Sequence, residues 1–389
     1  MKSSRCVRAW MRALCCGVLV AGAGWAWRAQ ADELPEPVNV PSLMKGDWAT
    51  RRAEILKIFT EQEYGVRPVE RPADLAFSVE PDRPCVGGKA VHRRVHISCK
   101  GPNAPFSFVA DAYFPKGAKN VGGFICVGWK FDADAEDPSC DAFPVKDIIA
   151  RGYAGIGFNY VTVADDNRDT YLDSGVFKAF GPTKETLKPD SWGTLSAWAW
   201  AMSRVLDWVE TQSEFNPKRF GAVGHSRCGK TAIWAGATDT RFALTCSNDS
   251  GCAGAKLNHV DLPKSESVAR ISTVFPHWFA RNYSQWGKKE MEMPFDQHML
   301  LALCAPRRLA VASATKDDWA GPPGEFLAAR LASPAWEQFG LKGLVAPEGF
   351  PKPQTHLAEG CVTYQLREGK HALSAWDWAR YMDVMDKIK

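Results

Sequence analysis

The stretch Arg219-Phe-Gly-Ala-Val-Gly-His-Ser-Arg-Cys-Gly-Lys230 decides the fold that we expect for this chain. Its apolar run from Phe220 to Val223 is typical of a short buried strand. The run breaks at Gly224, and a helical pattern resumes at Lys230. The sequence therefore places Ser226 on a sharp strand-to-helix turn. There its hydroxyl is held above a sheet, and backbone N–H groups of the next helix point at the same spot.

This turn resembles the nucleophile elbow of α/β-hydrolases, whose usual pattern is G-x-S-x-G. Gly224 and Ser226 fit that pattern, but the following glycine is Gly229, one position late. The alternative is a tight turn in any parallel sheet, with Ser226 as a helix cap. The resemblance implies a serine nucleophile at the carboxyl edge of the sheet.

The rest of the chain favours a mostly parallel sheet. Residues 76–79, 90–97 and 106–114 alternate apolar and polar side chains, which predicts antiparallel strands at the start of the sheet. Later apolar runs alternate with helical patterns, the longest of which covers residues 191–210. We therefore expect an α/β-hydrolase fold of three layers, with a mostly parallel central sheet sandwiched by helices. The further predicted strands are residues 122–128, 153–160, 242–247, 308–314 and 361–366.

The first 31 residues read as a secretory signal peptide. A basic segment is followed by the apolar residues 13–27 and by Ala29-Gln-Ala31, which fits a cleavage site. We expect a secreted or periplasmic protein without a membrane span. Residues 1–31 carry five of the basic residues and no acidic ones, so removing them changes the net charge from +4 to −1. The charge therefore gives no indication of a nucleic-acid partner.

Residues 32–389 contain no linker, repeat or low-complexity run, and we expect a single catalytic domain that is a monomer. Nine cysteines remain after cleavage, so at least one thiol is free. They form no paired C-x-x-C motifs, so we expect no metal and no other cofactor. Cys85 and Cys99 flank a hairpin signal, where a disulfide and two isolated buried thiols are both reasonable.

Two loops carry additional candidates. Trp129-Lys-Phe131 follows a predicted strand, and in this fold that loop often supplies an N–H group to the oxyanion hole. Residues 165–173 hold four aspartates, but their spacing does not match a calcium-binding EF-hand loop. We expect a solvated loop there.

Histidine and aspartate residues follow the predicted strands after Ser226. A serine nucleophile needs a base, and the base needs an acid to orient it. In this fold the chain order is serine, then the acid, then the histidine that acts as the base. Only His371 lies directly after the last strand. Asp317, its neighbour Asp318 and Asp249 all lie at strand ends, where an aspartate also often caps a turn. Position alone leaves the acid open.

At this point a more specific resemblance appears. Gly224-His-Ser-Arg-Cys-Gly-Lys230 resembles the nucleophile motif of glucuronoyl esterases, and the similarity continues in Trp278-Phe, in the segment from Pro294 to Leu303 and in Gly369-Lys-His371. That family cleaves the ester between the 4-O-methyl-glucuronic acid branches of xylan and lignin alcohols. The resemblance implies that Ser226 is the nucleophile and His371 the base.

It also implies further roles. Arg227 would stabilise the oxyanion, Lys230 would contact sugar hydroxyls, and Trp319 would stack near the sugar. Many members carry a glutamate acid where this chain has Asp249, while bacterial relatives use an aspartate two residues before the tryptophan, here Asp317. We favour Asp317, because the shorter Asp249 would be drawn away from the histidine. Asp249 remains either a supporting residue or the alternative acid.

One departure indicates the bacterial branch of the family. Fungal members join a cysteine before the nucleophile to one after the histidine, and this chain has His225 and Ala372 there. Another carbohydrate esterase, acting on acetyl xylan or feruloyl groups, would keep the same catalytic residues. A peptidase would require a site for a peptide N-terminus, which no segment marks. A non-catalytic glycan-binding homologue would be expected to have lost Ser226 or His371.

Overall fold

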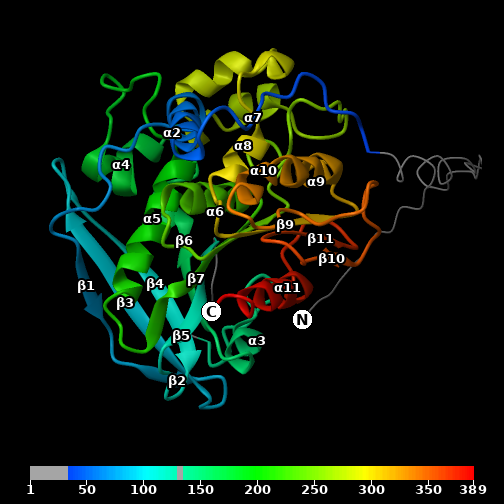
Figure 1. Cartoon of the computed structure of the whole chain (residues 1–389). Helices are drawn as coiled ribbons and strands as arrows, with labels where there is room; N and C mark the ends of the chain where they lie inside the picture. The colour runs from blue at the N-terminus through cyan, green and yellow to red at the C-terminus, as the bar shows by residue number, and fades with distance from the viewer. Residues whose placement is uncertain (1–33, 129–134) are drawn as a thin grey trace, which may run out of the picture.

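The computed structural model describes residues 34–128 and 135–389 (Figure 1). The expected signal peptide and the loop Trp129-Lys-Phe131 lie outside the described residues. Within the described ranges, no helix combines the length and the apolar character that a bilayer crossing requires.

One eleven-stranded sheet organises the chain, with the strand order β1-β3-β4-β6-β5-β7-β8-β9-β11-β10 and β2 beside β3. The block from β6 to β11 is parallel throughout, and the pairs at both edges are antiparallel. The predicted mixed sheet is therefore confirmed. The strands are β1 (Ala76–Val79), β2 (Arg83–Cys85), β3 (Ala90–Lys100), β4 (Pro105–Pro115), β5 (Val121–Gly128), β6 (Ala154–Asn159), β7 (Phe215–His225), β8 (Leu244–Asn248), β9 (Arg308–Ala314), β10 (Thr355–Leu357) and β11 (Val362–Arg367).

Helices cover both faces of this sheet (Figure 1). The longest, α5, is buried along its whole length, which explains its run of tryptophans. The helices are α2 (Trp48–Phe59), α3 (Val145–Ala150), α4 (Gly175–Phe180), α5 (Thr194–Val209), α6 (Arg227–Thr238), α7 (Val268–Val274), α8 (Gln297–Ala302), α9 (Pro322–Leu331), α10 (Pro334–Glu337) and α11 (Ala375–Met385).

The two faces of the sheet carry separate hydrophobic cores. In β5, Ile125 and Val127 belong to the larger core, which includes α5 and α6, while Phe124 and Cys126 belong to the smaller one. Trp378 of α11 packs in that smaller core. Because successive side chains of a strand point to opposite faces, a continuous apolar run is what a strand covered on both sides needs. The expected three-layer arrangement follows.

A disulfide between Cys85 and Cys99 is wrong. Cys85 ends β2 and pairs with Ala90 across the expected hairpin, but Cys99 lies far along β3, opposite Phe106 of β4. A strand advances about 3.3 Å per residue, which separates the two positions by roughly 30 Å. Both thiols are free and buried.

Candidate active site

Ser226 lies between β7 and α6 with φ 57° and ψ −123°, a conformation that non-glycine residues seldom adopt. Two glycines make room for it. A Cβ atom on Gly224 would lie 1.9 Å from the carbonyl oxygen of Cys228, and one on Gly229 would lie 3.0 Å from the carbonyl oxygen of Asn248. The second glycine therefore marks the residue at which the helix passes the end of β8. This geometry explains why it comes one position later than in the usual pattern.

The ends of the neighbouring strands are joined by backbone hydrogen bonds that continue beyond the sheet. The Ser226 N–H donates to the Asn248 carbonyl at 2.9 Å, and the Asp249 N–H donates to the Ala312 carbonyl at 2.8 Å. In parallel sheets the carboxyl ends of the strands meet at one edge. The loops after β7, β8, β9 and β11 therefore present their side chains to the same place.

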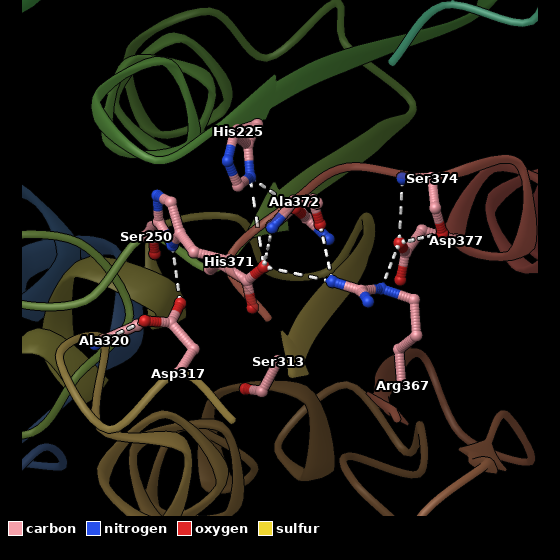
Figure 2. Close-up of polar contacts among 12 residues, drawn as sticks. His225, Ser250, Ser313, Asp317, Ala320, Arg367, His371, Ala372, Ser374 and Asp377 are labelled. Carbon is pink, nitrogen blue, oxygen red and sulfur yellow. Dashed lines mark hydrogen bonds and ion pairs between the residues drawn. The ribbon is translucent and has the colours of Figure 1, made fainter. Parts of the chain in front are cut away.

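His371 and Asp317 form a hydrogen-bonded pair at this edge (Figure 2). The distance from His371 Nδ1 to Asp317 Oδ2 is 2.6 Å, and the two loops are tied by Lys316 N–H donating to the Gly369 carbonyl. A carboxylate acceptor places a proton on Nδ1 and leaves Nε2 to act as a base. The side chain of His371 is 41% exposed, while that of Asp317 is buried. The side chain of His371 thus reaches solvent and that of Asp317 does not.

The ring of His225, the residue before Ser226, packs against the ring of His371 with centroids 4.3 Å apart. His225 Nδ1 lies 2.6 Å from the side-chain oxygen of Asn248, which fixes the ring. Burial, followed by the charge of His371, lowers the pKa of His225 to about 4. His225 is therefore neutral near pH 7. Its contact places His371 directly beside the strained serine turn.

Asp249 contacts the backbone directly after His371. Its Oδ2 accepts a hydrogen bond from the Ala372 N–H at 3.3 Å and lies 3.7 Å from the guanidinium of Arg367. Burial, with the charges of neighbouring carboxylates, raises the pKa of Asp249 well above its usual range. Asp249 Oδ2 also lies 3.9 Å from His225 Nδ1. None of these contacts is with the imidazole of His371, which Asp317 bonds directly.

Arg367, which the sequence did not single out, holds the base loop on both sides of His371 (Figure 2). Its Nη2 donates to the carbonyls of Lys370 and Ala372 at 2.7 and 2.8 Å, and its Nε donates to Asp377 at 3.0 Å. One signal in the sequence could have indicated this role. An arginine at the end of a buried strand needs hydrogen-bonding partners, because burying its charge without them is costly.

Arg227 is held in place by a carboxylate from another loop. It forms an ion pair with Asp166, and its guanidinium lies 4.8 Å from the ring centre of Trp278. Burial alone would raise the pKa of Asp166, but the hydrogen bond from His277 and the charge of Arg227 lower it below its usual range. The expectation of a solvated loop at residues 165–173 is therefore wrong for Asp166. Sequence spacing could not show that this loop folds onto the first turn of α6.

Lys230 and Trp319 lie in different environments. Lys230 is buried, which lowers its pKa, and its Nζ donates to the Ser250 carbonyl. Trp319 is 49% exposed. Glu266 was missed by the sequence analysis. Its side chain is buried and interacts electrostatically with Lys230. Its backbone N–H donates to the Trp319 carbonyl at 2.9 Å. Nothing in the local sequence distinguishes it from the other glutamates.

Another buried carboxyl belongs to Glu63, whose charge interacts with that of Lys230. Glu63 belongs to the π-helical turn η1 (Thr60–Tyr64), and its carboxyl oxygen accepts a hydrogen bond from Gln297 Nε2 at 3.1 Å. Burial, with a smaller effect of the Asp296 charge, raises the pKa of Glu63 from its ordinary value near 4.5 to about 8.

This shift makes stability depend on pH. The folded protein favours the protonated carboxyl, so the free energy of unfolding falls as pH rises from about 4.5 to about 8. Glu63→Gln keeps the shape and stays neutral. Between about pH 5 and pH 8, the free energy of unfolding of Glu63→Gln should fall by less than that of the wild type. The difference between the two decreases should be on the order of 2 kcal/mol. Urea unfolding at both pH values measures this, and Glu61→Gln, on a more exposed part of the same turn, should follow the wild type. Identical pH dependence of Glu63→Gln and wild type would contradict the argument.

Asp249, Asp317 and His371 bring potential metal-ligand atoms within 4.8 Å of one another. We predict that activity needs no metal, because a serine–histidine–acid mechanism is complete without one. Incubation with EDTA, followed by transfer to metal-free buffer, should leave the hydrolysis rate unchanged. Loss of activity that added zinc restores would overturn this prediction.

Comparisons with known proteins place this chain in a family. A family model described as glucuronyl esterase of fungi matches residues 130–340. Carbohydrate esterase MZ0003, from an unknown prokaryotic organism, is 35% identical over 86% of this chain and 84% of its own length. The structure of a glucuronoyl esterase from Solibacter usitatus is 34% identical and superposes with a TM-score of 0.81 over 91% of this chain and 98% of that one.

A third relative was solved with a ligand. A glucuronoyl esterase mutant from Sporotrichum thermophile, in complex with methyl 4-O-methyl-β-D-glucopyranuronate, is 25% identical, with a TM-score of 0.60 over 79% of this chain and 78% of that one. The fold and the strained serine turn define an α/β-hydrolase. The chain belongs to the glucuronoyl esterase family of carboxylic ester hydrolases.

Proposed function

We propose that the protein hydrolyses the ester between (4-O-methyl-)glucuronic acid side groups of glucuronoxylan and lignin alcohols, with Ser226, His371 and Asp317 as the catalytic triad. The observation that carries the proposal is the 2.6 Å hydrogen bond between His371 and Asp317 beside the strained Ser226 turn. The substrate class comes from the family, since one relative was solved with a glucuronate ester.

In this mechanism His371 Nε2 takes the proton of Ser226 as its oxygen attacks the ester carbonyl. The acyl-enzyme forms when the alcohol leaves with that proton, and water then releases the uronic acid by the same route. Asp317 holds the imidazole in the required tautomer and stabilises its protonated form. The N–H group of Arg227, the residue after the nucleophile, is an oxyanion donor in this fold. Its guanidinium, fixed by Asp166, adds positive charge nearby.

The sugar would lie between Lys230, Glu266 and Trp319. Trp319 offers an exposed aromatic face, and the two charged side chains offer groups for hydroxyls. Because Lys230 and Glu266 are buried and their opposite charges interact, they are held in fixed positions before substrate arrives. We further propose a secreted or periplasmic monomer whose residues 1–31 are removed as a signal peptide.

The test is a comparison of esters with one purified enzyme. Benzyl glucuronate should be hydrolysed with a higher kcat/KM than acetylated xylan or methyl ferulate, and Ser226→Ala protein gives the background rate. A preference for acetyl or feruloyl esters would assign another carbohydrate esterase activity to the same triad. No hydrolysis of any of them would leave only a glycan-binding role.

A further inference from the structure

A pocket of about 340 Å³ lies apart from the serine turn, on the other side of His277. Its walls come from the loop around Tyr171, the segment from Lys184 to Trp192 that precedes α5, and the segment from Pro276 to Arg281. The mechanism above uses none of its exposed residues. Its lining combines exposed cations with buried hydrogen-bonding groups that lack partners.

Three cations line this pocket, and none of its lining residues is acidic. Arg168, Lys184 and Arg281 are exposed, and in the described part of the chain none of their side chains makes an ion pair or a hydrogen bond. Elsewhere, arginines such as Arg151 and Arg241 bind two or more carboxylates. Three unpaired cations at one opening favour an anion.

The buried wall carries hydrogen-bonding groups without partners. Trp192 is 1% exposed, and its Nε1, which can only donate, has no acceptor among the described residues. His277 is 4% exposed, and its Nδ1 also has no partner, while its Nε2 bonds Asp166 at 3.0 Å. An unpaired buried donor is costly, so the Trp192 Nε1–H indicates a bound acceptor. His277 donates to Asp166 through Nε2, which leaves Nδ1 of the neutral ring to accept a hydrogen bond from a bound donor such as a hydroxyl. The partly buried ring of Tyr171 adds an apolar wall.

We propose that this pocket is a second binding site that takes a carboxylate attached to a ring. The cations would bind the carboxylate, and the aromatic wall would pack against the face of the ring. Two sources share this chemistry, a sugar acid and an aromatic acid. For the sugar acid, the inference rests on the proposed function. Glucuronoxylan carries unesterified uronates besides the ester that is cleaved, and the pocket would anchor one of them.

The pocket and the reaction site share one wall. His277 lines the pocket and bonds Asp166, which in turn holds Arg227 beside the nucleophile. An anchored uronate would therefore bring the polymer close to the serine without entering the space that the ester needs. Its effect should appear with the polymer and not with a small ester.

The binding test uses Ser226→Ala protein, so that no ester is turned over. Removing two cations with Arg168→Ala/Arg281→Ala should weaken calorimetric binding of free-acid glucuronoxylan by roughly tenfold, as expected for two charge-assisted contacts. Lys116→Ala/Lys119→Ala removes the same charge from a distant exposed turn and should leave binding unchanged. Glucuronoxylan whose carboxyls have been reduced to alcohols should bind equally weakly to all three proteins. Equal loss in both double variants would overturn the site, and so would unchanged binding of both glucuronoxylan and ferulate in Arg168→Ala/Arg281→Ala.

A second arm separates the two sources. Suppose that ferulate binds the parent protein but not Arg168→Ala/Arg281→Ala, while glucuronoxylan binds both equally well. That result would support the site and assign it to an aromatic acid. With Ser226 intact, the same double variant should hydrolyse benzyl glucuronate at the wild-type kcat/KM. If benzyl glucuronate is no substrate for either protein, the proposed function fails while the binding result still stands.

Discussion

Ser226→Ala and His371→Ala are each expected to lower kcat on a glucuronate ester by on the order of 10⁴- to 10⁶-fold, the loss that follows removal of a triad member. The physical reason is that the nucleophile and its base act as one unit. Without Ser226 there is no attacking oxygen, and without His371 no group takes the proton of that oxygen as it attacks. Initial rates on benzyl glucuronate measure the effect. Titration of the acyl-enzyme burst would show that Ser226→Ala forms no intermediate.

Both variants should remain folded, since each substitution only removes atoms at the edge of the site. Their thermal unfolding midpoints and circular dichroism spectra should match those of the wild type. Ser226→Ala protein that keeps more than roughly a tenth of the wild-type rate is incompatible with a serine nucleophile. Loss of activity together with loss of folding would say nothing about catalysis, so the unfolding measurement belongs to the experiment.

Asp317→Asn is expected to cost on the order of 10⁴-fold in kcat, because an amide no longer fixes the tautomer of His371 or stabilises its protonated form. Asp249→Asn should be milder by at least roughly tenfold, about 1.4 kcal/mol of transition-state stabilisation. Its carboxyl is buried with a raised pKa, and an amide oxygen can still accept the hydrogen bond from Ala372.

The control is Asp318→Asn. The Asp318 side chain is 44% exposed and lies 3.7 Å from Lys264, so its loss should leave the rate near that of the wild type. Rates of all three variants on one glucuronate ester decide the assignment. If Asp249→Asn is the most damaging, the acid is Asp249. If Asp318→Asn is inactive while the other two variants are only mildly affected, the acid in the loop after β9 is Asp318 and not Asp317.

The sequence could predict the parts of the site that follow from strand ends. Ser226, Asp317 and His371 come directly after apolar runs, and parallel pairing brings such ends to one edge. The same rule placed Asp249 there too, which is why position alone could not choose between the acids. That choice depends on side-chain direction: Asp317 points at the imidazole, and Asp249 at the backbone beyond it.

The remaining site residues depend on packing between distant segments. Asp166 reaches Arg227 because the loop after β6 folds over the start of α6, and Arg367 brackets the base because β11 ends beneath it. Glu266 meets the Trp319 backbone through a loop with no periodic pattern. Local propensity and spacing carry no information about such contacts.

The position of His371 in the loop after the last strand should also determine when during folding the enzyme becomes active. Parallel pairing of β9 with β11 joins segments separated by α9 and α10, and such non-local contacts form late because the intervening chain must first be ordered. During synthesis the N-terminal part of a chain emerges first. The nucleophile can therefore be in place before its base exists. Recovery of esterase activity on refolding should report the final docking step and lag behind the tryptophan fluorescence of the larger core.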